Sequence, residues 1–334
     1  MTKKPTIGVI QGDPAGIGPE LLTKLLSDFD VRGRANILVI GAPAVFDRGQ
    51  SVSATEICIR HVSRTDDIGF DQETLLHLDL DIPGIADTPI ARVSAEGGRS
   101  SLEGLRTAFE LSRDGVLDGI CFMPFNKESM HLGGNEFTDE LGFARDFFSV
   151  ATRVSEFNVA RGMWNGRVTS HVAMKDVPAL LTEKVICESI ELADRTLRLA
   201  GYERPRIVVA AYNPHAGDGG LLGREEIEII RPAIEKMQGR QMDVTGPLPA
   251  DTLWLKVRDG EYDTVVTMYH DQGQIAIKLL GFDRGVSVLA GLPVPLTTPA
   301  HGTAFDIAGQ NVANLTPSKN AFMMAVDMAE RDLD

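Results

Sequence analysis

The sequence has few cysteines and no long apolar segment among its 334 residues. Cys58, Cys121 and Cys187 stand at unrelated spacings, which excludes the paired-thiol pattern of a structural zinc site. Cys121 lies inside an apolar run, so we expect a small core residue there rather than a nucleophile. No apolar run approaches the ~18–20 residues needed to cross a bilayer. A membrane-spanning helix is therefore not expected.

An excess of basic residues is also missing, because the formal net charge is −14. Such a charge disfavours nucleic acid or an anionic membrane surface as a partner. A small anionic substrate stays compatible with it, since local cations or a metal can override the global field. Met1 to Pro5 lead directly into an apolar strand pattern without the features of a signal peptide, so we expect a cytoplasmic protein.

Apolar runs bounded by Gly, Pro or Asp alternate with helical patterns over most of the chain. This recurrence predicts an α/β fold with parallel strands, either as two domains or as one large unit with a cleft. Residues 50–95 are the least periodic part and receive no assignment. The expected strands are 6–10, 37–40, 119–123, 167–171, 207–212 and 264–269. One helix is expected to begin near Pro19, and further helices are expected at 103–112, 184–200 and 224–237.

Three of the predicted strands run directly into a histidine, namely His171, His215 and His270. Ligands of open α/β sheets collect at the carboxyl ends of the strands, so these imidazoles are placed to converge on one metal ion. Asp218, Asp251 and Asp271 stand nearby and are candidates to orient the imidazole rings. We interpret three further histidines, His61, His77 and His131, as core or surface residues whose hydrogen bonds are satisfied.

Two glycine-containing loops are candidates for nucleotide or anion binding. Residues 11–20 read as strand, glycine loop and helix, an arrangement that suits an anion at a helix N-terminus, although neither a P-loop nor a Rossmann fingerprint is present. A plain tight turn explains this stretch equally well. In residues 299–314, small residues around His301 would let the backbone approach a flat ligand, and Asp306 suits a ribose 2′-hydroxyl. A helix-entry loop with a solvated Asp306 is the alternative.

Lys127 follows a predicted strand, and Lys278 lies eight residues beyond His270. Either could bind a carboxylate or transfer a proton if burial or a metal lowered its pKa. Asp251 and Asp271 are further candidates for proton transfer.

Several of these motifs, taken together in one order, resemble the 4-hydroxythreonine-4-phosphate dehydrogenase family, the oxidoreductases of pyridoxal phosphate biosynthesis. The resemblance spans nearly the whole length. Its motifs are Gly12 to Glu20, His171 with Lys175-Asp176, Asn213 to Gly220, Gly246 to Asp251, Tyr269 to Gly273 and His301 to Gly309. The first and last are also similar to loops of isopropylmalate dehydrogenases, which share the fold.

The resemblance implies a homodimer of two-domain, mostly parallel α/β subunits with an interdomain cleft and an active site at the dimer interface. The division expected is 1–127 plus 288–334 on the cofactor side and 128–287 for metal, substrate and dimerisation. His171, His215 and His270 would hold one divalent metal, with His270 coming from the partner chain. Zinc is the first candidate metal, and Co, Ni, Fe, Mn or Mg are alternatives. NAD, in preference to NADP, would contact Gly12, His301, Gly302, Thr303, Ala304, Asp306 and Asn314.

The chain departs from this family where the substrate phosphate would bind. Glu140 and Leu141 replace a His-Thr pair, while Ser287 and Leu296 stand where the family has Asn and Arg. Lys278 is the one member of that polar set that remains. Each charge-assisted contact to phosphate contributes ~1.5–3 kcal/mol. Relatives that oxidise non-phosphorylated diols, such as the dihydrodiol dehydrogenase of terephthalate breakdown, look similar at the Leu296 position.

The hypothesis is therefore oxidation of a secondary alcohol β to a carboxylate with loss of CO₂. The metal would lower the pKa of the alcohol and stabilise developing negative charge. A non-phosphorylated diol or hydroxy acid is the preferred substrate, and Lys278 would anchor it. Authentic 4-hydroxythreonine-4-phosphate oxidation is the first alternative. A metal-binding relative that has lost catalysis is the second.

Overall fold

The computed structural model describes residues 4–63, 68–70 and 75–332. Residues 1–3, which enter the expectation about a signal peptide, lie outside this range. The chain forms two compact units, 1–150 with 292–334 (unit 1) and 151–291 (unit 2). No helix among the described residues is long and apolar enough to cross a membrane.

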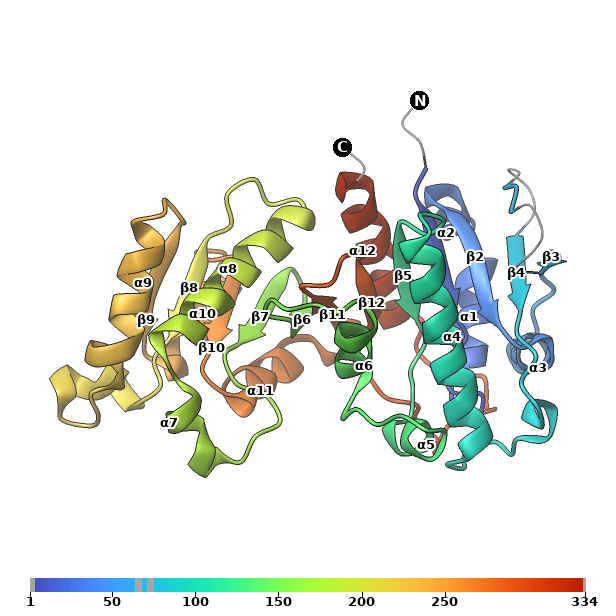
Figure 1. Ribbon diagram of the computed structural model, residues 1–334, viewed down its shortest axis with the longest axis horizontal. Helices are drawn as coiled ribbons and strands as arrows, with labels where there is room; N and C mark the ends of the chain where they lie inside the picture. The colour runs from blue at the N-terminus through green and yellow to red at the C-terminus, as the bar shows by residue number, and fades with distance from the viewer. Residues whose placement is uncertain (1–3, 64–67, 71–74, 333–334) are drawn as a thin grey trace. The chain divides into compact units, whose positions relative to one another are not determined.

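Unit 1 is a parallel sheet with the strand order β3-β4-β2-β1-β5-β12. Helix α4 contacts β1 and β2 on one face, while α1 contacts α3 and α12 (Figure 1). The strands are β1 (Thr6–Ile10), β2 (Asn36–Gly41), β3 (Ile59–Val62), β4 (Leu75–Asp79), β5 (Gly119–Phe122) and β12 (Leu296–Pro299). The helices are α1 (Gly18–Ser27), α2 (Phe29–Arg34), α3 (Pro43–Ser53), α4 (Ala95–Arg113), α5 (Lys127–Leu132), α6 (Glu140–Phe147) and α12 (Thr316–Asp332), with a 3₁₀ turn at Ile85–Asp87.

Unit 2 is a mixed sheet with the order β11-β6-β7-β10-β8-β9. Strand β6 is antiparallel to β7 and to β11, and the remaining pairs are parallel. The strands are β6 (Ser155–Ala160), β7 (Met163–Arg167), β8 (Ile207–Ala210), β9 (Val244–Leu248), β10 (Thr264–Thr267) and β11 (Val286–Ala290). The helices are α7 (Val177–Leu180), α8 (Glu183–Leu199), α9 (Arg231–Gln238), α10 (Ala250–Arg258) and α11 (His270–Gly281).

The core of each unit is formed by sheet strands that are buried on both faces of the sheet. β8 and β10 are buried along their whole length, as expected for central parallel strands covered by helices. Trp254 of α10 and Ile277 of α11 pack with Val208 and Val265 in one cluster of unit 2. Cys121 of β5 is fully buried, and burial raises the pKa of its thiol to about 12. The prediction of a core cysteine is confirmed.

The structure corrects several sequence-based boundaries. The fold class and most predicted elements are confirmed, but β6 and β11 are antiparallel, because β6 and β7 form a hairpin through Arg161 and Gly162 at positive φ. β7 ends at Arg167, before the histidine. The predicted helix 224–237 begins with a π-helical turn, Glu226–Ile230, that continues into α9.

The unit boundaries also differ from the expected division at 127/128 and 287/288. Residues 128–150 cluster with unit 1 because α6 packs on α4. The ring of Phe109 lies 5.9 Å from that of Phe143, 5.4 Å from that of Phe147 and 5.1 Å from that of Phe148. Residues 288–291 cluster with unit 2 because β11 pairs with β6 over its full length.

Candidate active site

The predicted metal ligands all belong to unit 2 and follow its parallel strands. His171 lies four residues beyond β7, His270 begins α11 after β10, and His215 lies in a turn after β8. β10 lies between β7 and β8 in the sheet, so the three segments leave the same edge. The ring centroids of His171 and His270 are 5.4 Å apart.

His215 opens an unusual backbone segment in which every residue from 215 to 220 has positive φ. His215, Ala216 and Asp218 adopt this left-handed region although they carry a Cβ, with φ of 53°, 55° and 45°. Such conformations each cost of order 1–3 kcal/mol and persist only where surrounding contacts enforce them. The turn is therefore held by its neighbours.

Glu226 binds the residues immediately before this turn. Its fully buried carboxylate accepts hydrogen bonds from the backbone N–H of Tyr212 (2.9 Å) and Asn213 (2.7 Å), and from the side-chain amide of Asn213 (2.9 Å). Gly217 has a φ of 78°, in the left-handed region that favours glycine, and a Cβ there would come within 2.7 Å of the same carboxylate. Glu226 thus positions the chain that carries His215.

Two further contacts organise the His270 loop. The Gln272 side chain accepts from Met268 N–H (2.8 Å) and donates to the carbonyl of Ala211 (2.7 Å), which ties the ends of β10 and β8 together. The Nδ1 of His270 lies 2.7 Å from the Asp271 carboxylate. With Nδ1–H donating to that carboxylate, the Nε2 lone pair of His270 is left for a ligand.

The three imidazoles of one chain do not meet in a single coordination sphere. Among the described residues, the group whose ligand atoms all lie within 4.8 Å of one another is His61, His77 and Asp79, not the predicted triplet. A metal bound by His171, His215 and His270 therefore needs side-chain movement or a histidine from a second copy of the chain.

The proposed proton-transfer residues occupy different units. Three of them are exposed residues of unit 2. Asp251 lies in the first turn of α10, Asp271 lies in the first turn of α11, and Lys278 lies about two turns further along α11. Lys127 is the first residue of α5 in unit 1 and is also exposed. The structure thus brings Asp251 and Asp271 to the strand edge of the histidines within unit 2.

Two of the predicted substrate residues are buried. Ser287 on β11 donates its hydroxyl to Glu156 (2.6 Å) and accepts from Asn158 (3.1 Å), in a network that extends to the buried Arg167. Its hydroxyl is therefore engaged within unit 2. Leu296 on β12 has no exposed surface within the described structure.

Glu140 and Leu141 lie at the N-terminus of α6 and are half-buried. Asp139 caps this helix by accepting a hydrogen bond from Gly142 N–H (2.9 Å), and Glu140 adds a second carboxylate in the first turn. Carboxylates at this position already satisfy the positive end of the helix dipole.

The glycine loop after β1 is a packed turn rather than an open anion cradle. Every residue from Thr6 to Leu22 is buried, including Gly12. A Cβ on Gly12 would approach Met123 Cβ to 2.8 Å. Burial raises the pKa of Asp13, whose carboxylate accepts from Ala15 N–H (2.8 Å). A carboxylate here disfavours a bound anion.

The loop at 301–314 is more open. Gly302, Asp306 and Asn314 are exposed, and a Cβ on Gly302 would meet nothing within 4 Å. Thr303 is buried against the glycine loop, where its carbonyl accepts from Ile17 N–H (3.0 Å) and a Cβ on Gly16 would come within 2.8 Å of Thr303 Cβ. Ala304 has a positive φ of 42°. His301 is half-buried, and burial lowers the pKa of its ring.

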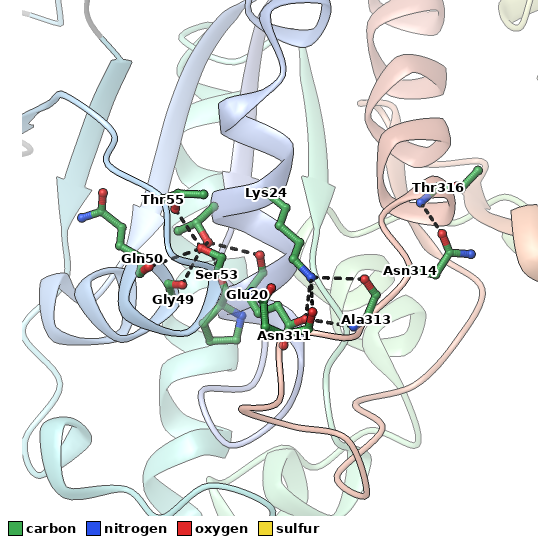
Figure 2. A network of polar contacts seen from close by, with 12 residues as sticks. Glu20, Lys24, Gly49, Gln50, Ser53, Thr55, Asn311, Ala313, Asn314 and Thr316 are labelled. Carbon is green, nitrogen blue, oxygen red and sulfur yellow. Dashed lines mark hydrogen bonds and ion pairs between the residues drawn. The ribbon is translucent and has the colours of Figure 1, made fainter.

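An ion pair on α1 holds the far end of this loop (Figure 2). Glu20, almost fully buried, accepts from Lys24 Nζ (2.8 Å) and from Ala313 N–H (2.9 Å). Lys24 also donates to the carbonyls of Asn311 (3.2 Å) and Ala313 (3.4 Å). Asn314, the next residue, accepts a hydrogen bond from the N–H of Thr316 (3.0 Å), the first residue of α12. The pair thereby fixes the position of Asn314.

Removal of Lys24 is expected to destabilise unit 1. Lys24→Met leaves the buried carboxylate of Glu20 without its cation, which costs about 2–4 kcal/mol of unfolding free energy. Urea unfolding measures this loss. Lys184→Met, which removes an exposed partner of Glu188, is the matched control and should change stability by less than about 0.5 kcal/mol. Equal stability of the two variants would contradict the role of the ion pair.

Sequence reasoning missed Glu226, Gln272 and the Glu20–Lys24 pair. Glu226 and Lys24 stand on helical patterns where a charged residue is ordinarily solvated. A usable signal was the run of His215 to Gly220 itself, since several glycines around a histidine require a buttress for an unusual backbone.

Comparison with known proteins identifies the family. Residues 33–325 match the family model described as Pyridoxal phosphate biosynthetic protein PdxA. A Pseudomonas aeruginosa protein, provisionally assigned as 4-hydroxythreonine-4-phosphate dehydrogenase 2, is 47% identical, with 97% of both chains covered. The D-threonate 4-phosphate dehydrogenase of Cupriavidus necator is 37% identical, with 98% of both covered.

Solved structures agree with this result. The 4-hydroxythreonine-4-phosphate dehydrogenase from Burkholderia phymatum has a TM-score of 0.82 at 37% identity, covering 97% of this chain and 98% of that one. A terephthalate 1,2-cis-dihydrodiol dehydrogenase from Burkholderia xenovorans has a TM-score of 0.69 at 27% identity, with 97% and 98% covered. A β-decarboxylating dehydrogenase from Thermococcus kodakarensis, 14% identical with a TM-score of 0.51 and 96% and 81% covered, shares the fold. The chain is a dehydrogenase that belongs to the PdxA family.

Proposed function

We propose that this protein is an NAD-dependent and divalent-metal-dependent dehydrogenase that oxidises a secondary alcohol β to a carboxylate, with loss of CO₂. The observation that carries the proposal is the delivery of His171, His215 and His270 to one strand edge of unit 2, in a chain of the PdxA family. The membership of this family argues against a metal-binding protein without catalysis. Failure to bind NAD by calorimetry would favour that reading instead.

The residues present fit a metal. Neutral imidazole is a common ligand for Zn²⁺, Co²⁺, Ni²⁺ and Fe²⁺, and the His270–Asp271 contact directs Nε2 outward. A bound metal would supply Lewis acidity, which stabilises negative charge on the alcohol oxygen and then on the product of decarboxylation. Glu226 and Gln272 hold the backbone that presents the histidines.

The residues of the 301–314 loop fit NAD. Gly302 leaves open space beside the backbone, and exposed Asp306 can accept hydrogen bonds from a ribose 2′-hydroxyl and would repel a 2′-phosphate. NAD would accept the hydride of the alcohol. His301, Thr303, Ala304 and Asn314 would line the nucleotide.

Lys278 would anchor the substrate by its positive charge, since it lies on the same helix as His270. Asp251 and Asp271 are proposed to move protons at the strand edge. Lys127, in unit 1, is proposed for the same purpose.

The structure of α6 supports a substrate without a phosphate group. The two carboxylates of Asp139 and Glu140 stand at the helix end where phosphate would otherwise bind backbone N–H groups. Ser287 already donates its hydroxyl proton to Glu156, so this proton is not available to a phosphate oxygen. A non-phosphorylated diol or hydroxy acid is therefore the first candidate substrate.

A phosphorylated hydroxy acid is the second candidate, favoured by the relatives. Two of them are named for 4-hydroxythreonine 4-phosphate and D-threonate 4-phosphate. Both compounds carry a hydroxyl β to a carboxylate, so the same oxidation applies to them.

Glu140→Gln separates the two candidates by NADH production. Glu140 is proposed to face the end of the substrate at which D-threonate 4-phosphate carries its phosphate group. Neutralising Glu140 should then lower KM for D-threonate 4-phosphate about 5–10-fold, because a repulsion of about 1 kcal/mol between the carboxylate and the phosphate is removed. KM for D-threonate itself should change by less than about twofold. Glu136→Gln, an exposed glutamate before α6, is the control. Wild-type preference for the phosphorylated compound by about 100-fold in kcat/KM would establish the second candidate instead.

A homodimer is proposed on the surface of unit 2. Large apolar side chains are exposed there on α11 and around the histidine loops: Val172, Met174, Leu180, Leu221, Leu255, Ile275 and Leu279. Exposed apolar side chains of this size are typical of protein interfaces where they gather into one patch. A second copy on this surface would bring its own histidine loop beside that of the first.

A further inference from the structure

A second group of imidazole and carboxylate side chains lies on the outer strands of unit 1. His61 is on β3, and His77 and Asp79 are on the neighbouring β4, with His61 directly paired to His77 in the parallel register. Positions 77 and 79 of a strand share one face. One ligand atom from each of the three residues lies within 4.8 Å of the others.

The contacts within this group involve the atoms that bind metals. Asp79 Oδ1 lies 2.6 Å from His77 Nδ1 and 2.7 Å from His61 Nδ1, and the two rings are 5.2 Å apart. His77 has no exposed side-chain surface, whereas His61 and Asp79 are 47% and 39% exposed. Burial lowers the pKa of the His77 imidazole.

Gln11 supplies an independent sign of a ligand. Its side chain is 2% exposed, its Nε2 lies 2.9 Å from His77 Nε2, and its Oε1 has no partner among the described contacts. If His77 bound a metal through Nδ1, its Nε2 would carry the proton and need an acceptor. Rotation of the Gln11 amide would bring Oε1 to that position and would exchange the hydrogen bond that Nε2 donates to the Ala42 carbonyl (3.2 Å) for the orienting contact that metal-bound histidines ordinarily have.

We propose that His61, His77 and Asp79 form a divalent-metal site, separate from the predicted histidine triplet of unit 2. Two imidazoles and one carboxylate suit Zn²⁺, Ni²⁺, Co²⁺ or Cu²⁺, with water in the remaining positions on the exposed side. Ligand atoms around a tetrahedral zinc are ~3.2–3.4 Å apart, given bonds of ~2.0–2.1 Å. The contacts of 2.6 and 2.7 Å from Asp79 Oδ1 to the two Nδ1 atoms are shorter than this by about 0.5–0.8 Å, so the carboxylate has to move outward on binding.

Zinc binding by the chelator-stripped full chain tests this site. Equilibrium dialysis against ZnCl₂ with metal analysis gives the zinc content, and His215→Ala provides a background in which the unit 2 site is disabled. That variant should bind one zinc per chain, and adding His61→Ala with Asp79→Asn should remove it. His131→Ala, another exposed histidine of unit 1, should keep it. Zinc should also raise the melting temperature of His215→Ala but not of the triple variant.

Circular dichroism of each variant verifies the fold, and His61→Gln gives a milder substitution in the same assay. Equal zinc content with and without His61 and Asp79, or no zinc in His215→Ala, would overturn the proposal. Two zinc ions in His215→Ala that fall to one in the triple variant would support this site and count against the triplet in unit 2.

Discussion

Alanine at any of His171, His215 or His270 is expected to lower kcat/KM for NADH production by at least about 1,000-fold, or about 4 kcal/mol of transition-state stabilisation. Each imidazole would supply one of three bonds to a cation that offsets charge on the reacting oxygen. NAD affinity, measured by calorimetry, should change by less than about threefold, because the nucleotide loop belongs to unit 1. His131→Ala is the matched control.

The same variants test whether the site is shared between two chains. The triplet of one chain does not meet around one point, so a partner histidine would complete it. Mixing inactive His171→Ala and His270→Ala subunits should then restore about a quarter of the wild-type rate, by the statistics of random pairing in a twofold dimer. Mass spectrometry of isotope-labelled subunits verifies exchange. Full activity of any one variant would remove that histidine from the site.

Glu226→Gln is expected to reduce activity by at least about 100-fold and stability by about 2–4 kcal/mol. The amide keeps one acceptor for the N–H groups of Tyr212 and Asn213 but turns a donor towards the side-chain amide of Asn213, so a buried hydrogen-bond network is broken. The left-handed turn at 215–220 would then relax and displace His215.

Two measurements distinguish this positioning role from general destabilisation. Assayed well below its melting temperature, Glu226→Gln should bind zinc at the triplet at least about tenfold more weakly than wild type, as expected for loss of an orienting residue. Glu228→Gln, on the exposed side of the same helix, should leave both metal affinity and activity unchanged. Normal metal affinity in Glu226→Gln would limit this residue to a structural role.

Much of the fold could be predicted because apolar periodicity reports buried strands directly. β1, β5, β8 and β10 were each expected near their observed positions. Strand direction could not be predicted from the same signal: β6 and β11 are buried like their parallel neighbours, and their antiparallel pairing depends on a hairpin at Arg161 and Gly162.

The candidate site shows the same division. The position of histidines after strands is local information, so their common edge could be predicted. The contact of Glu226 with the 212–213 backbone depends on how a π-helical turn packs, which the sequence pattern does not report. The pairing of His61 with His77 likewise depends on the register of β3 and β4, and single histidines gave no reason to expect it.

Anomalous diffraction at the zinc absorption edge, from crystals grown with zinc and NAD, tests the central claim most directly. The account predicts a peak about 2.0–2.2 Å from imidazole nitrogens of His171, His215 and His270, with at least one of these contributed by a second copy of the chain. An active protein whose crystals show no metal at these three histidines would contradict it.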